Sequence, residues 1–274
     1  MYGRLKDMKL EPTLVTYNTL LAGLGKEGRT KEANELFTAM ISNGCHPNTV
    51  TYNTLVDCLC RSDEVDLAIE KFSEMGFMNC FPDLVTYNSL IHGSTKENRM
   101  NDAFVLFFQM QKVLFPDCVT ICTFIPGMVK NSRVEDALKI IEIFMSHVQR
   151  HVEPSFWEDL MSGILVKNDL DKSMAFAESL MSTEVYRDAS VFVPLFKVLS
   201  KRRTLEAYNF FVKTRSYIGH AKLEVYNILI GGLVDVGLSE MAWNLFEEMR
   251  NSGCAPNVST YNFLLPMCPR CVNV

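Results

Sequence analysis

The string Leu14-Val-Thr-Tyr-Asn-Thr-Leu20 occurs three times in the first third of this chain. It returns as Thr49-Val-Thr-Tyr-Asn-Thr-Leu55 and as Leu84-Val-Thr-Tyr-Asn-Ser-Leu90, each time 35 residues further on. The position of its tyrosine recurs along the whole chain at intervals of 34 to 36 residues, as Tyr17, Tyr52, Tyr87, Ile121, Trp157, Phe192, Tyr226 and Tyr261. A constant period of this length is typical of a solenoid, in which each unit buries its apolar face only against its neighbours.

Each unit has the pattern of two helices joined by a turn. Between Tyr17 and Pro47 the apolar residues fall at helical spacings in two groups. The groups are Leu20, Leu21 and Leu24, then Ala33, Leu36, Phe37 and Met40. The segment Gly25-Lys-Glu-Gly28 separates them, and Asn43-Gly44 followed by Pro47 ends the second group, because glycine permits a left-handed terminus and proline cannot continue a helix.

Composition narrows the class of protein. The 274 residues are 48% hydrophobic and 22% charged, which suits a folded chain, and we expect no membrane-spanning segment. The 27 Lys+Arg against 32 Asp+Glu give a net charge of −5, so bulk electrostatic attraction to nucleic acid is not expected, although a basic stripe on one face is compatible with this total.

Cysteines and the first residues suggest neither a metal site nor a leader. Nine cysteines make an odd count, which favours a reducing compartment. The Cys268-x-x-Cys271 spacing has no second pair to complete a zinc site, so we predict no metal and no other cofactor. Residues 1 to 8 have neither an apolar signal core nor an Arg-rich and Ser-rich presequence, and we expect no targeting signal in this chain.

The repeating motifs resemble those of the pentatricopeptide repeat (PPR) family. They are Val-Thr-Tyr-Asn-Thr-Leu, Lys-Glu-Gly-Arg, Glu-Leu-Phe-x-x-Met and Gly-x-x-Pro-Asn/Asp. The steady length is similar to that of the pure-repeat (P) class. The resemblance implies an all-α fold, a right-handed superhelical solenoid of antiparallel helix-turn-helix repeats of about 35 residues.

The match to the family motifs divides the chain into five parts. We expect a partial repeat at 1–13 that keeps only the second helix, three well-matched repeats at 14–117, three degenerate repeats at 118–222, one well-matched repeat at 223–257, and a partial repeat at 258–274. The ends therefore suggest a fragment, a truncated product or a chain that pairs end to end.

The resemblance also implies binding of single-stranded RNA at one nucleotide per repeat. In the family, the base is selected by the residue after the first helix's aromatic together with the last residue of the repeat. Here these pairs are Asn18 with Asn48, Asn53 with Asp83, Asn88 with Asp117, and Asn227 with Asn257. A carboxylate only accepts hydrogen bonds and favours an edge with an N–H, as in uracil. By resemblance, Asn/Asp pairs prefer U and Asn/Asn pairs prefer a pyrimidine.

Two further columns match the family's RNA contacts. The residues that sandwich the base are Val15, Val50, Val85 and Val119. Cations stand nine residues after the aromatic position, where family members face phosphate, and they are Lys26, Arg61, Lys96, Lys130 and Lys201. The alternative is that cations favour helix C-termini through the helix dipole.

No base preference is transferred to the degenerate repeats at 118–222. Cys122 replaces the selecting asparagine, the end of that repeat is either Glu153 or Ser155, and the next repeats offer Glu158 with Asp188 and Val193 with Lys222. Glu224 also replaces the expected valine. In the family's parallel polarity the readable target is pyrimidine-U-U, three unread nucleotides, then a pyrimidine.

The leading hypothesis is therefore a non-catalytic, sequence-selective RNA-binding protein. The resemblance implies action on mitochondrial or plastid transcripts, in processing, stability, splicing or translation. No motif of an enzyme occurs in the chain. Two alternatives stay open, a helical scaffold that binds other proteins and a decayed relative without RNA function.

Overall fold

The computed structural model describes residues 12–148, 154–167, 169–182, 189–218 and 223–267. Within these ranges the chain forms 15 α-helices and two short 3₁₀ helices, without a strand. This confirms the all-α prediction. Several residues singled out in the sequence lie outside the described ranges, namely Glu153, Asp188, Lys222, Cys268 and Cys271.

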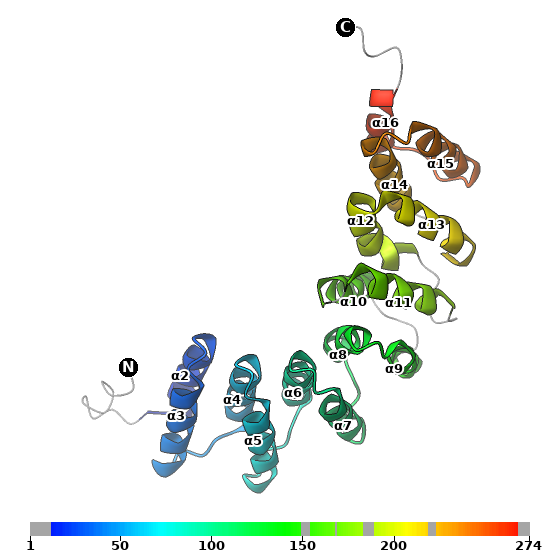
Figure 1. Ribbon diagram of the computed structural model, residues 1–274. Helices are drawn as coiled ribbons and strands as arrows, with labels where there is room; N and C mark the ends of the chain where they lie inside the picture. Colours follow the sequence, from blue (N-terminus) through cyan, green and yellow to red (C-terminus); the bar gives the residue numbers. More distant parts are fainter. Residues whose placement is uncertain (1–11, 149–153, 168, 183–188, 219–222, 268–274) are drawn as a thin grey trace. The chain divides into compact units, whose positions relative to one another are not determined.

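The chain divides into two compact units, Met1–Gly127 and Met128–Val274, with the boundary inside helix α8 (Cys118–Lys130). The first unit contains α2 (Leu14–Lys26), α3 (Thr30–Ser42), α4 (Thr49–Arg61), α5 (Val65–Phe77), α6 (Leu84–Lys96) and α7 (Met100–Gln111). Helices α2, α4 and α6 form one layer, and α3, α5 and α7 form the second (Figure 1). Helix α4 packs against both α2 and α6.

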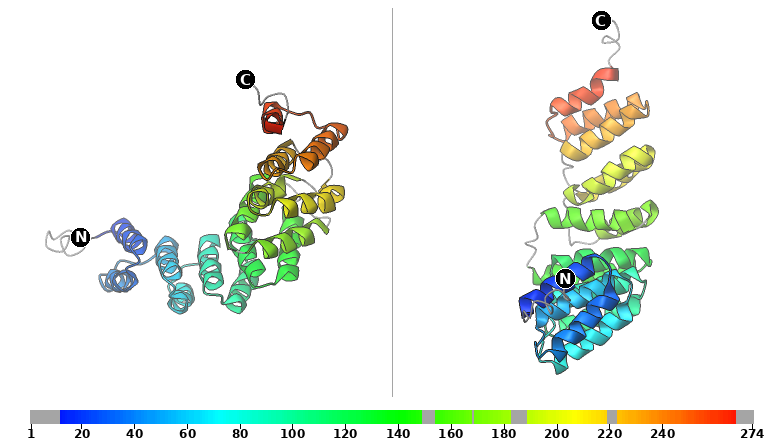
Figure 2. Two further views of the ribbon diagram at one scale, coloured as in Figure 1. Left: turned by 45° about the horizontal axis from the view of Figure 1, so that its top comes forward. Right: turned by 90° about the vertical axis from the view of Figure 1, so that its left-hand side faces the viewer.

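The second unit repeats this arrangement. It contains α9 (Val134–His147), α10 (Pro154–Lys167), α11 (Leu170–Ser182), α12 (Val193–Arg202), α13 (Thr204–Ile218), α14 (Leu223–Asp235), α15 (Ser239–Asn251) and α16 (Val258–Leu264). Helix α12 packs against α10 and α14, and α14 also packs against α16, while α11 packs against α9 and α13 (Figure 2). Each unit is thus a stack of antiparallel helix pairs, as the solenoid prediction requires.

In five of the turns inside pairs, though not between α12 and α13, where Arg203 has φ −145°, one residue lies in the left-handed region. This residue is Gly28 (φ 69°) after α2, and Gly237 (φ 76°) after α14. Asp63, Asn98 and Ser132 hold the same place in the turns after α4, α6 and α8, with φ between 59° and 63°. Glycine, Asn and Asp reach this region most readily, so the turn chemistry agrees with the position of the predicted break.

Aromatic pairs join successive repeats. The phenylalanine of one second helix meets the tyrosine of the next first helix edge to face, with ring centroids 5.2 to 6.0 Å apart. The pairs are Phe37–Tyr52, Phe72–Tyr87, Phe211–Tyr226 and Phe246–Tyr261. Edge-to-face rings add about 0.5–1.5 kcal/mol to the burial of their area. Tyr52, Tyr87 and Tyr226 are buried and join successive repeats through these contacts, whereas Tyr261 on α16 is 52% exposed.

First helices approach one another through small residues. Gly93 on α6 lies directly against Cys60 on α4. A Cβ at Gly93 would be only 2.8 Å from both Cys60 Cβ and Cys60 Sγ, so this position has no room for a larger residue. Gly25 on α2 faces Cys58 in the same way, with the corresponding Cβ distance at 3.1 Å. Burial raises the pKa of the Cys60 thiol to about 12, in keeping with a packing role.

The repeat around Phe192 departs from the others. Elsewhere the aromatic position falls on the fourth residue of the first helix, whereas Phe192 ends a 3₁₀ turn (Ala189–Phe192) and α12 starts only at Val193. Pro194 explains this, because proline lacks an N–H and fits only the first turn of a helix. Val193 therefore opens a helix instead of sitting one turn inside it.

Two broad features complete the fold. No helix in the described ranges is long and apolar enough to span a membrane. Cys45, Cys58, Cys60, Cys80 and Cys254 are free thiols, and no group of three or more metal-ligating side chains gathers in the same ranges.

Candidate nucleic-acid interface

The selecting asparagines are brought onto the last residues of their repeats. Asn53, on the second turn of α4, donates from Nδ2 to both carboxylate oxygens of Asp83, at 3.0 and 3.2 Å. Asn88 on α6 donates to Asp117 Oδ1 at 3.2 Å, and Asn227 on α14 donates to Asn257 Oδ1 at 3.2 Å. Residues about 30 positions apart in sequence thus form three contacting pairs, which we name the selector pairs.

The second member of each selector pair also caps the next helix. Asp83 is the N-cap of α6, where its Oδ1 accepts the backbone N–H of Thr86 at 3.0 Å. Thr86 Oγ1 in turn accepts the backbone N–H of Asp83, which completes a capping box. Asp117 and Asn257 make the same exchange with Thr120 and Thr260. The cap fixes where the second selecting residue stands.

The fourth predicted pair is assembled differently. Asn48 caps α4 and accepts the N–H of Thr51 at 2.9 Å, as expected from the pattern. However, Asn18 is not hydrogen-bonded to Asn48, and its buried Oδ1 has no hydrogen-bond partner in the described part of the chain. The structure therefore brings together three of the four predicted pairs by direct contact.

The predicted sandwiching valines point outward on the first turn of their helices. Val15, Val50, Val85 and Val119 are each between 56% and 73% exposed, whereas valine is among the residues most often buried in proteins. The same position on α16 is occupied by Ser259, which is exposed and offers a base no comparable apolar surface.

A cavity of about 550 Å³ lies beside the Asn227–Asn257 pair. Its walls also include Glu224 and Phe263. Glu224 stands where valine is expected and makes an ion pair with Lys197 at 2.8 Å. The cavity thus combines the two amide groups and the Glu224 carboxylate with apolar surface from Leu223, Ile228 and Phe263.

The predicted basic column lies at the C-terminal ends of first helices, and two of its members are ion-paired. Arg61 contacts Asp57 at 3.1 Å, and Lys96 contacts Asp63 at 2.8 Å while donating to the Arg61 carbonyl at 2.8 Å. Exposed pairs of this kind contribute only about 0–1 kcal/mol, so a phosphate can displace the carboxylate.

The other members of the column are Lys26, Lys130 and Lys201. All three are exposed and make no ion pair with any residue in the described ranges.

Near Lys130 the structure adds two cations that the strict nine-residue spacing missed. Partial desolvation and then the charge of Lys130 lower the pKa of Lys167, and Lys172 donates to the Lys130 carbonyl at 2.7 Å. These three lysines form a local basic cluster in the second unit.

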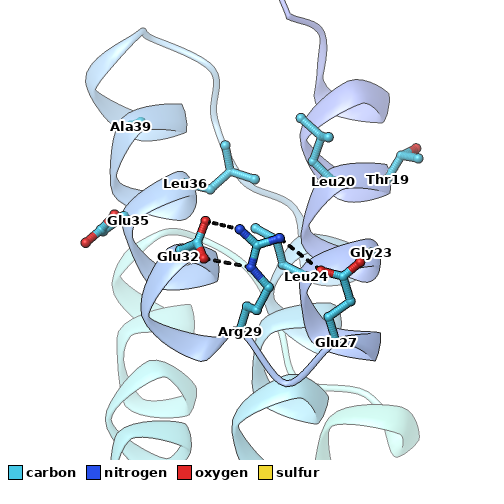
Figure 3. Close-up of a pocket in the computed structure, with 10 residues that line it drawn as sticks. All are labelled: Thr19, Leu20, Gly23, Leu24, Glu27, Arg29, Glu32, Glu35, Leu36 and Ala39. Atoms are coloured by element: carbon cyan, nitrogen blue, oxygen red, sulfur yellow. Dashed lines mark hydrogen bonds and ion pairs between the residues drawn. The ribbon is translucent and has the colours of Figure 1, made fainter. Parts of the chain in front are cut away.

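Arginines at the start of the second helices are neutralised by neighbours. Arg29 donates to Glu27 at 2.9 Å and, in a bidentate contact, to Glu32 (Figure 3). The hydrogen bond from Arg29 lowers the pKa of the Glu32 carboxyl. Arg99, Arg133 and Arg203 make the same contact with an acid three residues later. These arginines support the turns and are not part of the basic column.

The hollow around Arg29 is a separate feature. It has a volume of about 570 Å³ between α2 and α3, with Leu20, Leu24 and Leu36 on its walls (Figure 3). It contains no member of a selector pair. We therefore do not assign it to the interface.

The selecting positions of the degenerate repeats lie in different settings. Cys122 on α8 is half-buried, and Glu158 is exposed on α10. Of the two alternatives for the partner of Cys122, Glu153 lies outside the described residues, while Ser155 is exposed on the first turn of α10. Asp188 and Lys222, the predicted partners of Glu158 and Val193, also lie outside the described residues. Val193 itself is buried, so it cannot meet a ligand.

Comparison with known proteins agrees with the repeat analysis. The model of the PPR repeat family matches residues 12–61, 47–96, 82–130 and 223–270. A rice protein named pentatricopeptide repeat-containing protein PPR5 homolog, chloroplastic, is 39% identical over 75 residues, and the maize PPR5 protein, also named chloroplastic, is 37% identical over 75 residues. Each alignment covers 26% of this chain and 15% of the relative.

Solved structures resemble the chain over nearly its whole length. PPR10 in complex with an 18-nt psaJ RNA element has a TM-score of 0.76 at 20% identity, covering 96% of this chain and 37% of that chain. Another structure, of PPR10 from maize, has a TM-score of 0.58 at 24% identity and covers 96% of this chain and 38% of that chain. This chain therefore spans well under half the length of the proteins it matches. From the family matches, the repeating motifs and the stacked helix pairs, the chain belongs to the pentatricopeptide repeat family.

Proposed function

We propose that this chain binds single-stranded RNA and that each selector pair reads one base. The observation that carries the proposal is the contact between Asn53 and Asp83, repeated in the same register by Asn88 with Asp117 and Asn227 with Asn257. A protein scaffold has no need for amide and carboxylate groups paired at one level of successive repeats. Structures similar to this chain include PPR10, whose name states a complex with RNA.

The first unit carries the sharpest base preference. An Asn carboxamide offers both a donor and an acceptor to a base edge, while the Asp beside it can only accept. Asn53 with Asp83 and Asn88 with Asp117 are therefore proposed to select U, and Asn18 with Asn48 a pyrimidine, which gives pyrimidine-U-U along this unit. Asn227 with Asn257 is proposed to take a pyrimidine separately in the second unit.

Affinity is proposed to come from other side chains. The exposed valines Val15, Val50, Val85 and Val119 supply apolar surface on which a base can lie, and each stacked base contributes about 1–3 kcal/mol whatever its identity. Phosphates are proposed to meet Lys26, Arg61, Lys96, Lys130 and Lys201, with the ion pairs of Arg61 and Lys96 exchanged on binding. Affinity and selectivity are then divided between different residues.

The biological role is proposed from the relatives. Two of them are named chloroplastic, which favours a plastid transcript as the target. The steady repeat length favours the P class. We propose a non-catalytic protein that covers a short transcript segment and thereby affects its processing, stability, splicing or translation.

Binding to short RNAs tests the proposal. The 274-residue chain is mixed with a labelled oligonucleotide containing C-U-U, against a competitor in which A replaces both uridines, in fluorescence anisotropy. We expect selective binding of the U-containing RNA. The double variant Asn53→Ala with Asn88→Ala should lose the selectivity, while Asn101→Ala, an exposed position on α7, should keep it. Equal binding of both RNAs, or no binding, would instead favour a protein scaffold.

A further inference from the structure

A threonine from the following repeat contacts each paired selecting asparagine. Thr86 Oγ1 donates to Asn53 Oδ1 at 2.5 Å, Thr120 Oγ1 to Asn88 Oδ1 at 2.7 Å, and Thr260 Oγ1 to Asn227 Oδ1 at 2.6 Å. All three threonines are completely buried. A buried hydroxyl requires a partner, and here the shortest contact of each is the asparagine of the previous repeat rather than its own capping residue.

These contacts close a ring that holds the carboxamide at both ends. In the ring around Asn53, the Asp83 carboxylate accepts from Asn53 Nδ2 and from the backbone N–H of Thr86. The Thr86 hydroxyl then donates to Asn53 Oδ1. A rotated carboxamide would turn its oxygen toward the Asp83 carboxylate and its nitrogen toward the hydroxyl, so two good contacts would become one repulsive and one weaker contact. The ring therefore admits one orientation of the amide.

The same ring forms without a charge. In the third selector pair, Asn257 stands where the other two pairs have aspartate. Its Oδ1 is identified as an acceptor because it receives the backbone N–H of Thr260 at 3.0 Å. Asn227 Nδ2 donates to that oxygen, and Thr260 Oγ1 donates to Asn227 Oδ1. The orientation is thus passed from the helix backbone through the cap to the selecting asparagine.

In the sequence, the presence of this threonine correlates with a selecting asparagine in the preceding repeat. The residue just before the aromatic position is threonine after repeats with a selecting asparagine, namely Thr51, Thr86, Thr120 and Thr260. After repeats without one it is Phe156, Val191 and Val225. Thr120 is present although its own repeat has Cys122, and Val225 is present although its own repeat has Asn227. The quality of the threonine's own repeat therefore does not explain its presence.

We propose that Thr86, Thr120 and Thr260 are positioning residues that set the base selectivity of the preceding repeat. The inference rests on the proposed function, since the asparagine it orients is the one proposed to read the base. With the hydroxyl bound to Oδ1, Asn53 presents one N–H and one oxygen lone pair in a fixed direction. A repeat then reads its base correctly only when the next repeat's first helix is in place.

Thr51 offers a matched control. It caps α4 with Asn48 in the same way as Thr86 caps α6 with Asp83, and it is equally buried. It makes no hydrogen bond to Asn18, whose Oδ1 is without a partner in the described ranges. Thr51→Val and Thr86→Val therefore remove the same capping contact, but only Thr86→Val removes a contact to a selecting asparagine.

The experiment measures base preference at single positions of the RNA. In competition with RNAs that carry U or A at the second nucleotide, Thr86→Val should reduce the preference for U about fivefold, as expected for one lost hydrogen bond. Thr86→Ser, which keeps the hydroxyl, should restore it. Thr51→Val should lower thermal stability like Thr86→Val while leaving the preference at the first nucleotide unchanged. Wild-type preference in Thr86→Val, or an equal loss of selectivity in Thr51→Val, overturns the inference.

A measurement without RNA separates this inference from the proposed function. If the wild-type chain has no base preference, the proposed function fails, and the selectivity role fails with it. The clamp itself is still tested by ¹⁵N relaxation of the Asn53 side-chain amide in selectively labelled protein. The amide should be rigid in the wild type, Thr86→Ser and Thr51→Val, and mobile in Thr86→Val. An equally rigid amide in Thr86→Val contradicts the clamp.

Discussion

Asp83 has two structural roles, as a helix cap and as a member of a selector pair. Asp83 ends one repeat, caps α6 through Thr86 and accepts two hydrogen bonds from Asn53. A substitution at Asp83 therefore changes both a helix terminus and a selector pair, since an N-cap contributes about 0.5–2 kcal/mol. Stability has to be measured beside base preference for any variant of a selector pair.

The buried tyrosines differ in what their hydroxyls contact, which gives a first prediction. Tyr17 accepts a hydrogen bond from Asn43 Nδ2 at 3.0 Å, whereas Tyr52 Oη is buried with no partner in the described ranges. Tyr17→Phe should therefore cost about 1 kcal/mol in the free energy of unfolding, while Tyr52→Phe should be neutral or stabilising. Urea denaturation of the two variants measures this. The reverse order of stability would contradict the hydrogen bonding.

Alkaline pH should weaken the fold through the same buried groups. Burial raises the pKa of Tyr52 from 10.0 to about 12 and that of Cys60 from 9.0 to about 12. Below about pH 8 both groups are largely protonated in the folded and unfolded chain. Between about pH 9 and 12 the unfolded chain releases these protons first and binds fewer than the folded one, so stability falls with pH.

The measurement for this second prediction is the urea midpoint at pH 8 and at pH 11. The midpoint should be lower at pH 11, and the decrease should be smaller in Tyr52→Phe, which lacks one of the two groups. A decrease of the same size in Tyr52→Phe would show that Tyr52 is not responsible.

At the scale of the element, the contact between first helices depends on small residues. A Cβ at Gly93 would lie 2.8 Å from Cys60 Cβ, on the neighbouring first helix, and 3.1 Å from Val65 Cγ2. Gly76, near the end of α5, has no atom within 4 Å of the corresponding position. The two glycines are alike in helical setting and differ in what surrounds them.

This contrast gives a third prediction. Gly93→Ala should destabilise the chain by about 1–3 kcal/mol, because α4 and α6 must separate to admit the methyl group. Gly76→Ala should stabilise it by up to about 1 kcal/mol through helix propensity. Thermal unfolding followed by circular dichroism compares them, and a neutral Gly93→Ala would show that the two helices are not in close contact.

Helix pairs could be predicted from the sequence because apolar spacing and turn residues are local signals. The expected break at Gly25 to Gly28 overlaps the last two residues of α2 and the turn before α3, and the residue at positive φ is Gly28. The shifted start of α12 was not predicted, although Pro194 gives the reason for it. A single proline overrides the register that the repeat period suggests.

The interface could be predicted only in part. The resemblance to the family pointed to the selecting asparagines, and the period gave their equivalent positions in each repeat. It did not reveal the hydroxyl contacts of Thr86, Thr120 and Thr260, since those depend on the distance between successive repeats. Nor did it reveal that Asn18 lacks the contact its counterparts make, because the motif around Asn18 is the same as around Asn53.

At the scale of the whole molecule, charged residues recur at fixed positions of the repeat. The net charge is −5, yet cations recur at the ends of first helices, while the arginines that start second helices are neutralised by adjacent acids. Bulk attraction to RNA is therefore weak, and electrostatic binding rests on a few lysines and Arg61.

The salt dependence of binding follows from this distribution. Each phosphate neutralised on a single strand contributes about 0.7 to the slope of log affinity against log salt. With five proposed phosphate contacts the slope should be no steeper than about −3.5, and Lys26→Gln should reduce it by about 0.7. Titrations between low and moderate salt measure both slopes. A much steeper slope would indicate nonspecific electrostatic binding.

The central claim is that a selector pair determines which base its repeat binds, and a change at one position tests it most directly. Asn53→Thr, with Asp83 kept, is compared with wild type in competition against RNAs carrying each of the four bases at the second nucleotide. Asn101→Thr on α7 is the control. The account predicts that wild type and control prefer U and that Asn53→Thr shifts toward a purine at this nucleotide alone. An unchanged preference in Asn53→Thr would contradict it.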